Sequence, residues 1–409
     1  MKPKKFSGYQ IFVIAILTIL QFSIILDFMV LSPLGPILRP ALNISPAQFG
    51  IVVAAYAISA GLSGLLAAGF ADKYDRKKLL LFFYTGFIIG TLFCGLAPTY
   101  HLLLAARIFT GIFGGVIGSI TFAIVTDMFA IEVRGRVMGF LQMAFASSQV
   151  LGIPVGLYFA EKWGWHSPFI MIVIVSMVVG IAIILFLKPI DEHLKIKNDR
   201  NAFTHLFKTI SNSTYLKTFA ATTLLATGGF MMMPFGADFG VNNLKLTLKQ
   251  LPTLYMVTGI ASMILGPLIG RLSDAWGKYR MFVAGSVLMI FIVILYCNLG
   301  PTPIWIVMGL NIVMFAGISA RMISSQALVS AVPEQADRGA FMSLNSSTQQ
   351  ISGGIASYIA GMIVVQAPSG ELLHYDTLGY VVAASIVITI VMIWFVNRHV
   401  AAKLHKTNF

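Results

Sequence analysis

Three ionisable residues, Asp27, Arg107 and Arg321, interrupt long apolar stretches of this sequence. A charge inside hydrocarbon costs several kcal/mol, on contested scales that start at about 2.5, so such residues need a partner or a function. Counted from one membrane face, Asp27 lies about 16 Å deep and Arg107 roughly 9 Å deep, at 1.5 Å per residue. Long side chains and helix tilt can close that gap, which predicts an Asp–Arg pair. Protonation of Asp27 would free Arg107, as proton coupling requires; a purely structural pair is the alternative.

Arg321 lies about 18 residues into its own apolar stretch and has no charged counterpart in the first half of the chain, where the matching residue is about Ile117. It could bind an anionic substrate group, or pair with Asp127 or a carbonyl. Amides in hydrocarbon more often join helices than bind ligands, and Met adapts to varied shapes. The predicted cavity lining is Gln142, Gln149, Asn311, Asn345, Gln349, Phe28, Tyr56, Met232 and Phe235. Such a lining suits a lipophilic substrate better than a sugar.

The composition predicts the kind of secondary structure that positions these charged and polar residues. Of 409 residues, 57% are hydrophobic and 11% charged, against roughly 25% charged in a soluble domain. Apolar runs of about 20 residues are long enough to cross a bilayer as helices, and hydrocarbon requires helices or closed barrels. We predict an all-α membrane protein with twelve transmembrane helices, at 10–38, 47–70, 79–98, 102–127, 136–160, 166–187, 216–240, 250–272, 280–299, 303–331, 339–365 and 376–397.

The distribution of charge excludes other classes and orients the helices. The net charge of +13 comes from short clusters between apolar runs, without a basic groove, so no nucleic-acid partner is expected. Four basic residues, Arg39, Lys162, Lys245 and Lys249, fall on one side of the predicted membrane, and nearly all the others fall on the side of the two termini. Because basic loops stay inside, both termini are predicted to be cytoplasmic. We find no ATP-binding loop, metal-ligand cluster or nucleophile–His–acid set, so no enzyme, cofactor or metal is expected.

The sequence contains an internal repeat at an offset of about 202 residues. Pro33-Leu-Gly-Pro36 matches Pro234-Phe-Gly-Ala237, and Arg134-Gly135 matches Arg338-Gly339. Because six helices separate the repeats, the halves face the same way, as in a parallel duplication. We therefore predict two pseudo-symmetric six-helix bundles, 1–187 and 216–409, joined by a cytoplasmic linker at 188–215.

The loop after the second predicted helix carries a family resemblance. Ala68-Gly-Phe-Ala-Asp72-Lys-Tyr-Asp75-Arg76-Lys77 resembles the signature G-x-L-A-D-R-x-G-R-K of the major facilitator superfamily, with departures at Ala68 and Asp75. A second copy, Gly270-Arg-Leu-Ser-Asp274-Ala-Trp-Gly277-Lys278, keeps both glycines. Charges here can hold the cytoplasmic face together in one state and part in another; a solvated turn that only sets topology is the alternative. The predicted gate is Asp72, Arg76, Arg134, Arg136, Asp274, Lys278 and Arg338.

Two further segments are similar to motifs of the drug:proton antiporter branch. Arg107-Ile-Phe-Thr110-Gly111 resembles R-x-x-Q-G, with Thr in place of Gln, and Val150-Leu-Gly152-Ile-Pro154-Val-Gly156 resembles a shortened antiporter motif. Gly152, Pro154 and Gly156 predict a hinge, because small residues pack closely and proline bends a helix.

The resemblance implies a monomeric transporter in a bacterial cytoplasmic membrane. Its partners would be protons, lipid and a small-molecule substrate. A proton-driven exporter of lipophilic or amphiphilic compounds is favoured. An uptake symporter for an organic anion or metabolite is the alternative, and a non-transporting sensor ranks lowest because no signalling domain is attached.

Overall fold

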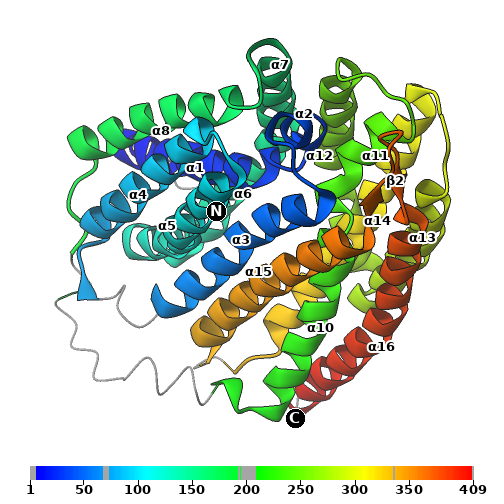
Figure 1. The fold of residues 1–409 in the computed structure, drawn as a ribbon. Coiled ribbons are helices and arrows are strands. Elements are labelled where there is room, and N and C mark those ends of the chain that lie inside the picture. The colour runs from blue at the N-terminus through cyan, green and yellow to red at the C-terminus, as the bar shows by residue number, and fades with distance from the viewer. Residues whose placement is uncertain (1–5, 68–72, 192–193, 195–208, 335–336, 408–409) are drawn as a thin grey trace.

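The computed structural model describes residues 6–67, 73–191, 194, 209–334 and 337–407, and these are almost entirely helical (Figure 1). The first half of the chain forms six spans, two of which are interrupted. Its elements are α1 (Gly8–Val30), α2 (Gly35–Leu42), α3 (Pro46–Ala67), α4 (Arg76–Leu96), α5 (Tyr100–Met128), α6 (Ile131–Ser147), the π-helical turn η2 (Ser148–Gly152), α7 (Ile153–Trp163) and α8 (Ser167–Phe186).

The second half repeats this arrangement and adds a short hairpin. Its elements are α10 (Ser213–Phe230), the 3-10 turn η4 (Met233–Phe235), α11 (Gly236–Asn242), α12 (Gln250–Trp276), α13 (Lys278–Cys297), α14 (Ile304–Ala331), α15 (Arg338–Ile363), β1 (Val365–Gln366), β2 (Leu372–Leu373) and α16 (Tyr375–Thr407). The two strands pair antiparallel between α15 and α16. The sequence did not predict this hairpin, since two-residue strands leave no periodicity to detect.

Among the described residues, eleven helices are long and apolar enough to cross a membrane. The twelfth span is α15, which has 26 residues but carries a polar run at Ser346-Ser-Thr-Gln-Gln350. This run is consistent with its position, because α15 packs along α3 at the contact between the two halves of the chain. The prediction of twelve helices in two six-helix bundles is therefore confirmed.

Two predicted spans are broken in the structure. The helix predicted at 10–38 ends at Val30 and restarts as α2, and the helix predicted at 216–240 ends at Phe230 and restarts as α11. Pro33 and Pro36 in the first case, and Pro234 in the second, lack the N–H that would continue the helix. The two breaks lie at repeat-related positions, so each half presents a short helix at the same end of the bundle.

The bundle has two distinct ends. We call the end that carries α2, α11 and the β1–β2 strands the hairpin end, where Asn243 bonds to the backbone of Leu372. We call the other the linker end, because both described termini lie there together with Lys188, whose backbone N–H donates a hydrogen bond to Tyr9 at the start of α1.

The two halves meet mainly through α3 and α15, which lie side by side in Figure 1. A Cβ at Gly354 of α15 would lie 2.6 Å from Ile58 Cγ1 and 3.0 Å from the carbonyl oxygen of Ala54, so only glycine allows this approach. Near the hairpin end, the ring of Phe49 on α3 lies 6.1 Å from that of Phe235 in the second half. Small and aromatic side chains thus form this contact without a charge.

Candidate functional site

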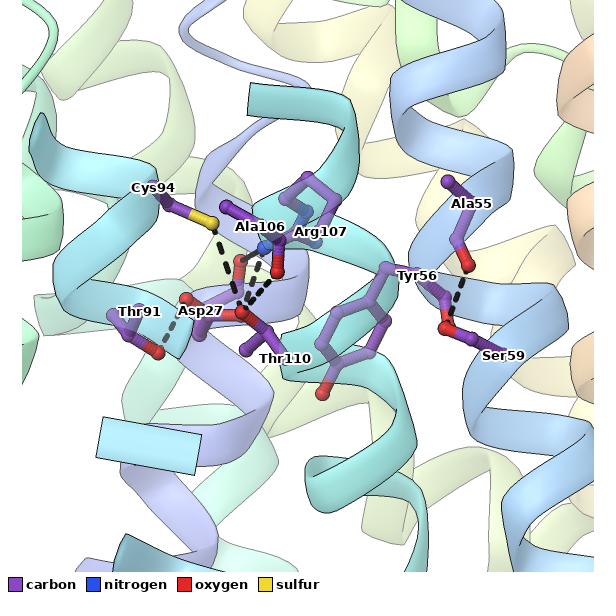
Figure 2. A network of polar contacts seen from close by, with 9 residues as sticks. All are labelled: Asp27, Ala55, Tyr56, Ser59, Thr91, Cys94, Ala106, Arg107 and Thr110. Carbon is purple, nitrogen blue, oxygen red and sulfur yellow. Dashed lines mark hydrogen bonds and ion pairs between the residues drawn. The ribbon is translucent and has the colours of Figure 1, made fainter. Parts of the chain in front are cut away.

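The site centres on a buried ion pair between α1 and α5. The Nη1 of Arg107 lies 2.8 Å from Oδ2 of Asp27, and the two side chains are 1% and 0% exposed (Figure 2). Arg107 also reaches the backbone carbonyl of Asp27 at 3.4 Å, while Thr91 of α4 donates to Oδ1 of Asp27 at 3.2 Å. The structure brings together the two residues that the sequence paired on depth alone, and Thr91, which the sequence did not single out, completes the carboxylate's contacts.

The aromatic ring of Tyr56 covers the arginine of this pair. The Arg107 guanidinium carbon lies 4.4 Å from the Tyr56 ring centroid, close enough for a cation–π interaction. Thr110, the residue that replaces Gln in the resembled motif, bonds to the carbonyl of Ala106 in its own helix and lies 3.7 Å from Sγ of Cys94. Arg107 therefore has a carboxylate and a π-face as partners, and Figure 2 shows them converging from three helices.

A group of aromatic rings continues from Tyr56 across the contact between the halves. The Phe28 ring lies 5.5 Å from that of Tyr56 and 6.0 Å from that of Phe230 on α10. Phe235 is fully buried beneath Phe49, while Met232 is half-buried. Of the predicted lining, Phe28 and Tyr56 thus lie beside the ion pair, and Phe235 packs nearer the hairpin end.

The predicted amide lining is not assembled into one cluster. Asn311 bonds to the carbonyl of Val307 in its own helix, and Asn345 accepts a hydrogen bond from Thr222 of α10 at 2.7 Å. Gln149 is buried, Gln349 is half-buried and Gln142 is exposed. Asn345 therefore joins two helices of the second half, the commoner role of an amide in a membrane protein.

The predicted hinge coincides with the π-helical turn. Pro154 has no N–H to donate to the carbonyl of Val150, and the N–H of Ile153 bonds to Ser148 instead, which widens the turn. A Cβ at Gly152 would lie 2.6 Å from Leu26 of α1, and one at Gly259 of α12 would lie 3.1 Å from the Val150 Cα. Gly156 is also buried. The irregular turn is therefore placed between the helix of Asp27 and the second half of the chain.

The described charges at the linker end include most of the predicted gate. Asp72 lies outside the described residues. Arg76 pairs through Nε with Asp127 at 3.1 Å, a residue near the end of α5 that the predicted gate did not include. Arg134 donates to the carbonyls of Phe129 and Thr126, which fastens the start of α6 to the end of α5. Arg136 lies over the ring of Phe6, 4.2 Å from its centroid.

The second-half copy of the motif makes local contacts. Asp274 pairs with Lys278 four residues later, across the α12–α13 turn at Gly277, whose φ of 95° favours glycine. Arg338 is exposed at the first turn of α15. In this conformation the contacts of Asp274 and Lys278 stay within one turn.

A second buried ion pair joins the two halves at the hairpin end. Nη1 of Arg39 on α2 lies 3.0 Å from Oδ2 of Asp238 on α11, and the side chains are 2% and 1% exposed. Nη2 of Arg39 also donates to the side-chain oxygen of Gln366 on β1 at 2.5 Å. The sequence analysis treated Arg39 as one of the basic residues that orient the helices, and it did not select Asp238 as a site residue. The signal that could have found the pair was the repeated Pro-x-Gly break, which places both residues on matching short helices.

An apolar hollow of about 200 Å³ adjoins the first ion pair's helix. Its walls include Phe22 and Leu26 of α1, Gly152 of the π-helical turn and Met171 of α8. A larger hollow, of about 540 Å³, lies at the hairpin end between residues 43–48 and 361–366, away from Asp27. The apolar hollow therefore lies closer to the candidate chemistry than the larger one.

Comparison with known proteins decides the family. The sequence profile of the Major Facilitator Superfamily matches residues 17–356 and 242–408. The chain belongs to the major facilitator superfamily. Among its relatives, the MFS-type transporter YceJ of Bacillus subtilis (strain 168) is 29% identical over 273 residues, covering 66% of this chain and 68% of YceJ. Multidrug resistance protein 3 of the same strain is 33% identical over 152 residues, 37% of this chain and 30% of that protein.

A solved structure agrees with this assignment at the level of the fold. The D-xylose–proton symporter has a TM-score of 0.76 to this chain at 14% identity, covering 94% of this chain and 97% of the symporter. The family and the fold make this chain a multi-pass membrane transporter with a small-molecule substrate, not an enzyme.

Proposed function

We propose that this transporter is a proton-coupled exporter of lipophilic or amphiphilic compounds that works by alternating access. The observation that carries the proposal is the buried Asp27–Arg107 pair, at 2.8 Å and with both side chains almost fully enclosed. A carboxylate paired so closely can accept one proton only by giving up its ion pair. One protonation event therefore changes the contacts of two helices.

The surrounding residues support this exchange step. When Asp27 is protonated, Arg107 keeps its contact with the Tyr56 ring at 4.4 Å and can still reach the Asp27 carbonyl at 3.4 Å. The charge is then partly uncompensated, and α1 and α5 lose the ion pair between them and keep only the weaker contact to the carbonyl. Because Leu26 packs on Gly152, movement of α1 is passed to the π-helical turn and to α12 behind it. Gly152, Pro154 and Gly156 are the proposed hinge.

The conformation of the structure fits one state of such a cycle. The Arg39–Asp238 pair joins the halves at the hairpin end, where Phe49 also contacts Phe235. At the linker end, the ion pairs Arg76–Asp127 and Asp274–Lys278 each stay within one half. We propose that this state is closed at the hairpin end, and that the linker-end charges, including Asp72, Arg134, Arg136 and Arg338, form contacts between the halves in the opposite state.

The substrate class is inferred from the groups beside the pair. Phe28, Tyr56 and Phe230 form an aromatic cluster that spans the halves, and Met232 lies two residues beyond Phe230. Rings and a flexible thioether suit an apolar or amphiphilic ligand and offer a sugar few polar partners. Multidrug resistance protein 3, which matches about a third of the chain, supports export.

Basic residues support the orientation. Lys and Arg dominate the linker end, which we therefore place in the cytoplasm together with both termini. The protein is proposed to act as a monomer in a bacterial cytoplasmic membrane, with the boundaries 1–187 and 216–409 for its two bundles.

A thermal-shift ligand screen of the purified protein at about pH 5.5 and pH 8 tests the proposal. Lipophilic cations, organic anions, sugars and nucleobases form the panel. Proton and substrate compete in an exporter of this kind, so hits should be lipophilic and bind better at pH 8. Asp27→Asn should remove the pH dependence, whereas Glu371→Gln, which neutralises a carboxylate that is 45% exposed, should keep it. Unchanged pH dependence in Asp27→Asn would contradict the coupling role.

One observation favours the uptake symporter as a second candidate. Arg321 lies buried in the second half without a recorded carboxylate partner among the described residues, as an anchor for an anionic substrate requires. In that case the hits would be organic anions or metabolites, and they would bind better at pH 5.5.

A further inference from the structure

The second half of the chain contains a buried arginine, Arg321, with which no carboxylate of the described residues pairs. Arg321 of α14 is 4% exposed, and neither its Nε nor its Nη2 has a hydrogen-bond partner among the described residues. Asp127, the carboxylate that the sequence offered as a partner, pairs with Arg76 instead. The Phe282 ring, centred 5.8 Å away, is at the limit of a cation–π contact. A charge this deep in a helical bundle is costly unless something pairs with it.

The internal repeat shows where a partner is missing. At the offset of 201 residues that relates Pro33-Leu-Gly-Pro36 to Pro234-Phe-Gly-Ala237, Asp27 corresponds to Gly228 of α10. A Cβ built on Gly228 would lie 3.7 Å from Nη1 of Arg321 and 3.4 Å from Oγ of Ser385 on α16. In the first half this position carries the carboxylate that pairs with Arg107. In the second half the position is a glycine, and Arg321, which is not the repeat counterpart of Arg107, lies beside it.

We infer that Arg321, together with the space beside Gly228 and Ser385, forms a binding site for one compact monovalent anion inside the second half. The ligand is either a free halide or the terminal carboxylate of a larger molecule, since one guanidinium balances one negative charge. The bound anion takes the place that a carboxylate on α10 would occupy. The site is separate from the Asp27–Arg107 pair and does not depend on the proposed direction of transport.

The test measures the melting temperature of the purified full-length transporter in the sodium salts of MES, chloride and benzoate at equal ionic strength. MES, a bulky sulfonate without a carboxylate, is the reference anion, chloride probes a free halide, and benzoate probes a carboxylate. We expect chloride, benzoate or both to raise the melting temperature by roughly 1–2 °C over MES, as a ligand at about ten times its Kd would in a chain of this length. A response to chloride alone identifies a halide site, and a response to benzoate alone identifies a carboxylate site. No response to either anion overturns the inference.

Three variants locate the response. Arg321→Gln removes the cation and should abolish the stabilisation by the anion. Gly228→Asp places a carboxylate beside the guanidinium, so it should also abolish the response while the arginine is retained. Gly228→Ala is the matched control, because its Cβ meets only ordinary van der Waals distances and adds no charge, and it should keep the full response.

The variants also separate this site from the proton-coupled one. Asp27→Asn should keep the anion response unchanged, even where it abolishes pH-dependent substrate binding. An anion response that persists in both Arg321→Gln and Gly228→Asp would place the ligand elsewhere and overturn the inference.

Discussion

Breaking the Arg39–Asp238 pair should open the hairpin end of the transporter. The two side chains are 2% and 1% exposed and lie on short helices of different halves, 3.0 Å apart. Removing one partner of a buried pair costs about 3–5 kcal/mol, because the other charge is left uncompensated. This free-energy cost destabilises only the state in which the hairpin end is closed, because only there are the two charges buried together. The variant Asp238→Asn should therefore shift the equilibrium toward the open state by a factor of roughly 150 to 5,000, enough to take a population that is about 1% open to more than half open.

Distance measurements between spin labels detect this shift. Ser45 and Thr247 are exposed, lie at the hairpin end and belong to different halves, so Ser45→Cys and Thr247→Cys provide the labelling sites. In the parent protein one short distance should dominate, and in Asp238→Asn a longer distance should reach a comparable population. The ion pair Lys245–Glu371 provides the control, since it lies at the same end within one half and is 51% and 45% exposed. Such a pair contributes at most about 1 kcal/mol, and Glu371→Gln should leave the distances unchanged.

A double variant tests the physical reason. Arg39→Gln combined with Asp238→Asn leaves no buried charge without a partner, so the short distance should be partly restored. If Asp238→Asn alone gives the same distances as Glu371→Gln, the pair does not hold the halves together and the reasoning is wrong.

Three further predictions concern the helix contacts. Gly354→Val should destabilise the contact between the halves by about 1–3 kcal/mol and slow transport. The control Gly339→Val lies on the same helix at a site where a Cβ meets no atom within 4 Å, so it should do neither. Equal transport rates in the two variants would contradict this. Pro154→Ala restores a backbone N–H, so it should raise thermal stability but lower turnover if the π-helical turn is a hinge; an unchanged turnover argues against the hinge. Asp127→Asn should lower the free energy of unfolding by about 1–2 kcal/mol, because it removes the partner of Arg76 from an ion pair that solvent screens only in part. The Arg76 side chain is 6% exposed and that of Asp127 is 23% exposed. A calorimetric scan that shows no loss of stability would make this ion pair dispensable.

The sequence was sufficient for the fold because the apolar runs and their charges obey simple rules. Predicted and observed spans agree closely, as for 303–331 against Ile304–Ala331. The Asp27–Arg107 contact could also be predicted, since two isolated charges at similar depth in hydrocarbon have few other partners. The gate role of Arg76 stays a prediction; the structure pairs it with Asp127, which the predicted gate did not include.

The remaining site residues depend on tertiary contacts that no local pattern records. Arg39 and Asp238 are 199 positions apart and become neighbours only because both spans break at proline. Hydropathy assigned them to a loop and a helix end, where charges normally reach water. The same holds for Gly228, because no local pattern marks this glycine and only the tertiary structure places it beside Arg321.

Proton movement in proteoliposomes tests the central claim most directly. Purified protein is reconstituted with a pH-sensitive dye inside, and a lipophilic hit from the ligand screen is added to the wild type, Asp27→Asn and Glu371→Gln. The account predicts substrate-dependent proton flux in the wild type and in Glu371→Gln, and none in Asp27→Asn, which should still exchange labelled for unlabelled substrate. Proton flux of wild-type size in Asp27→Asn would show that the buried pair does not carry the coupling.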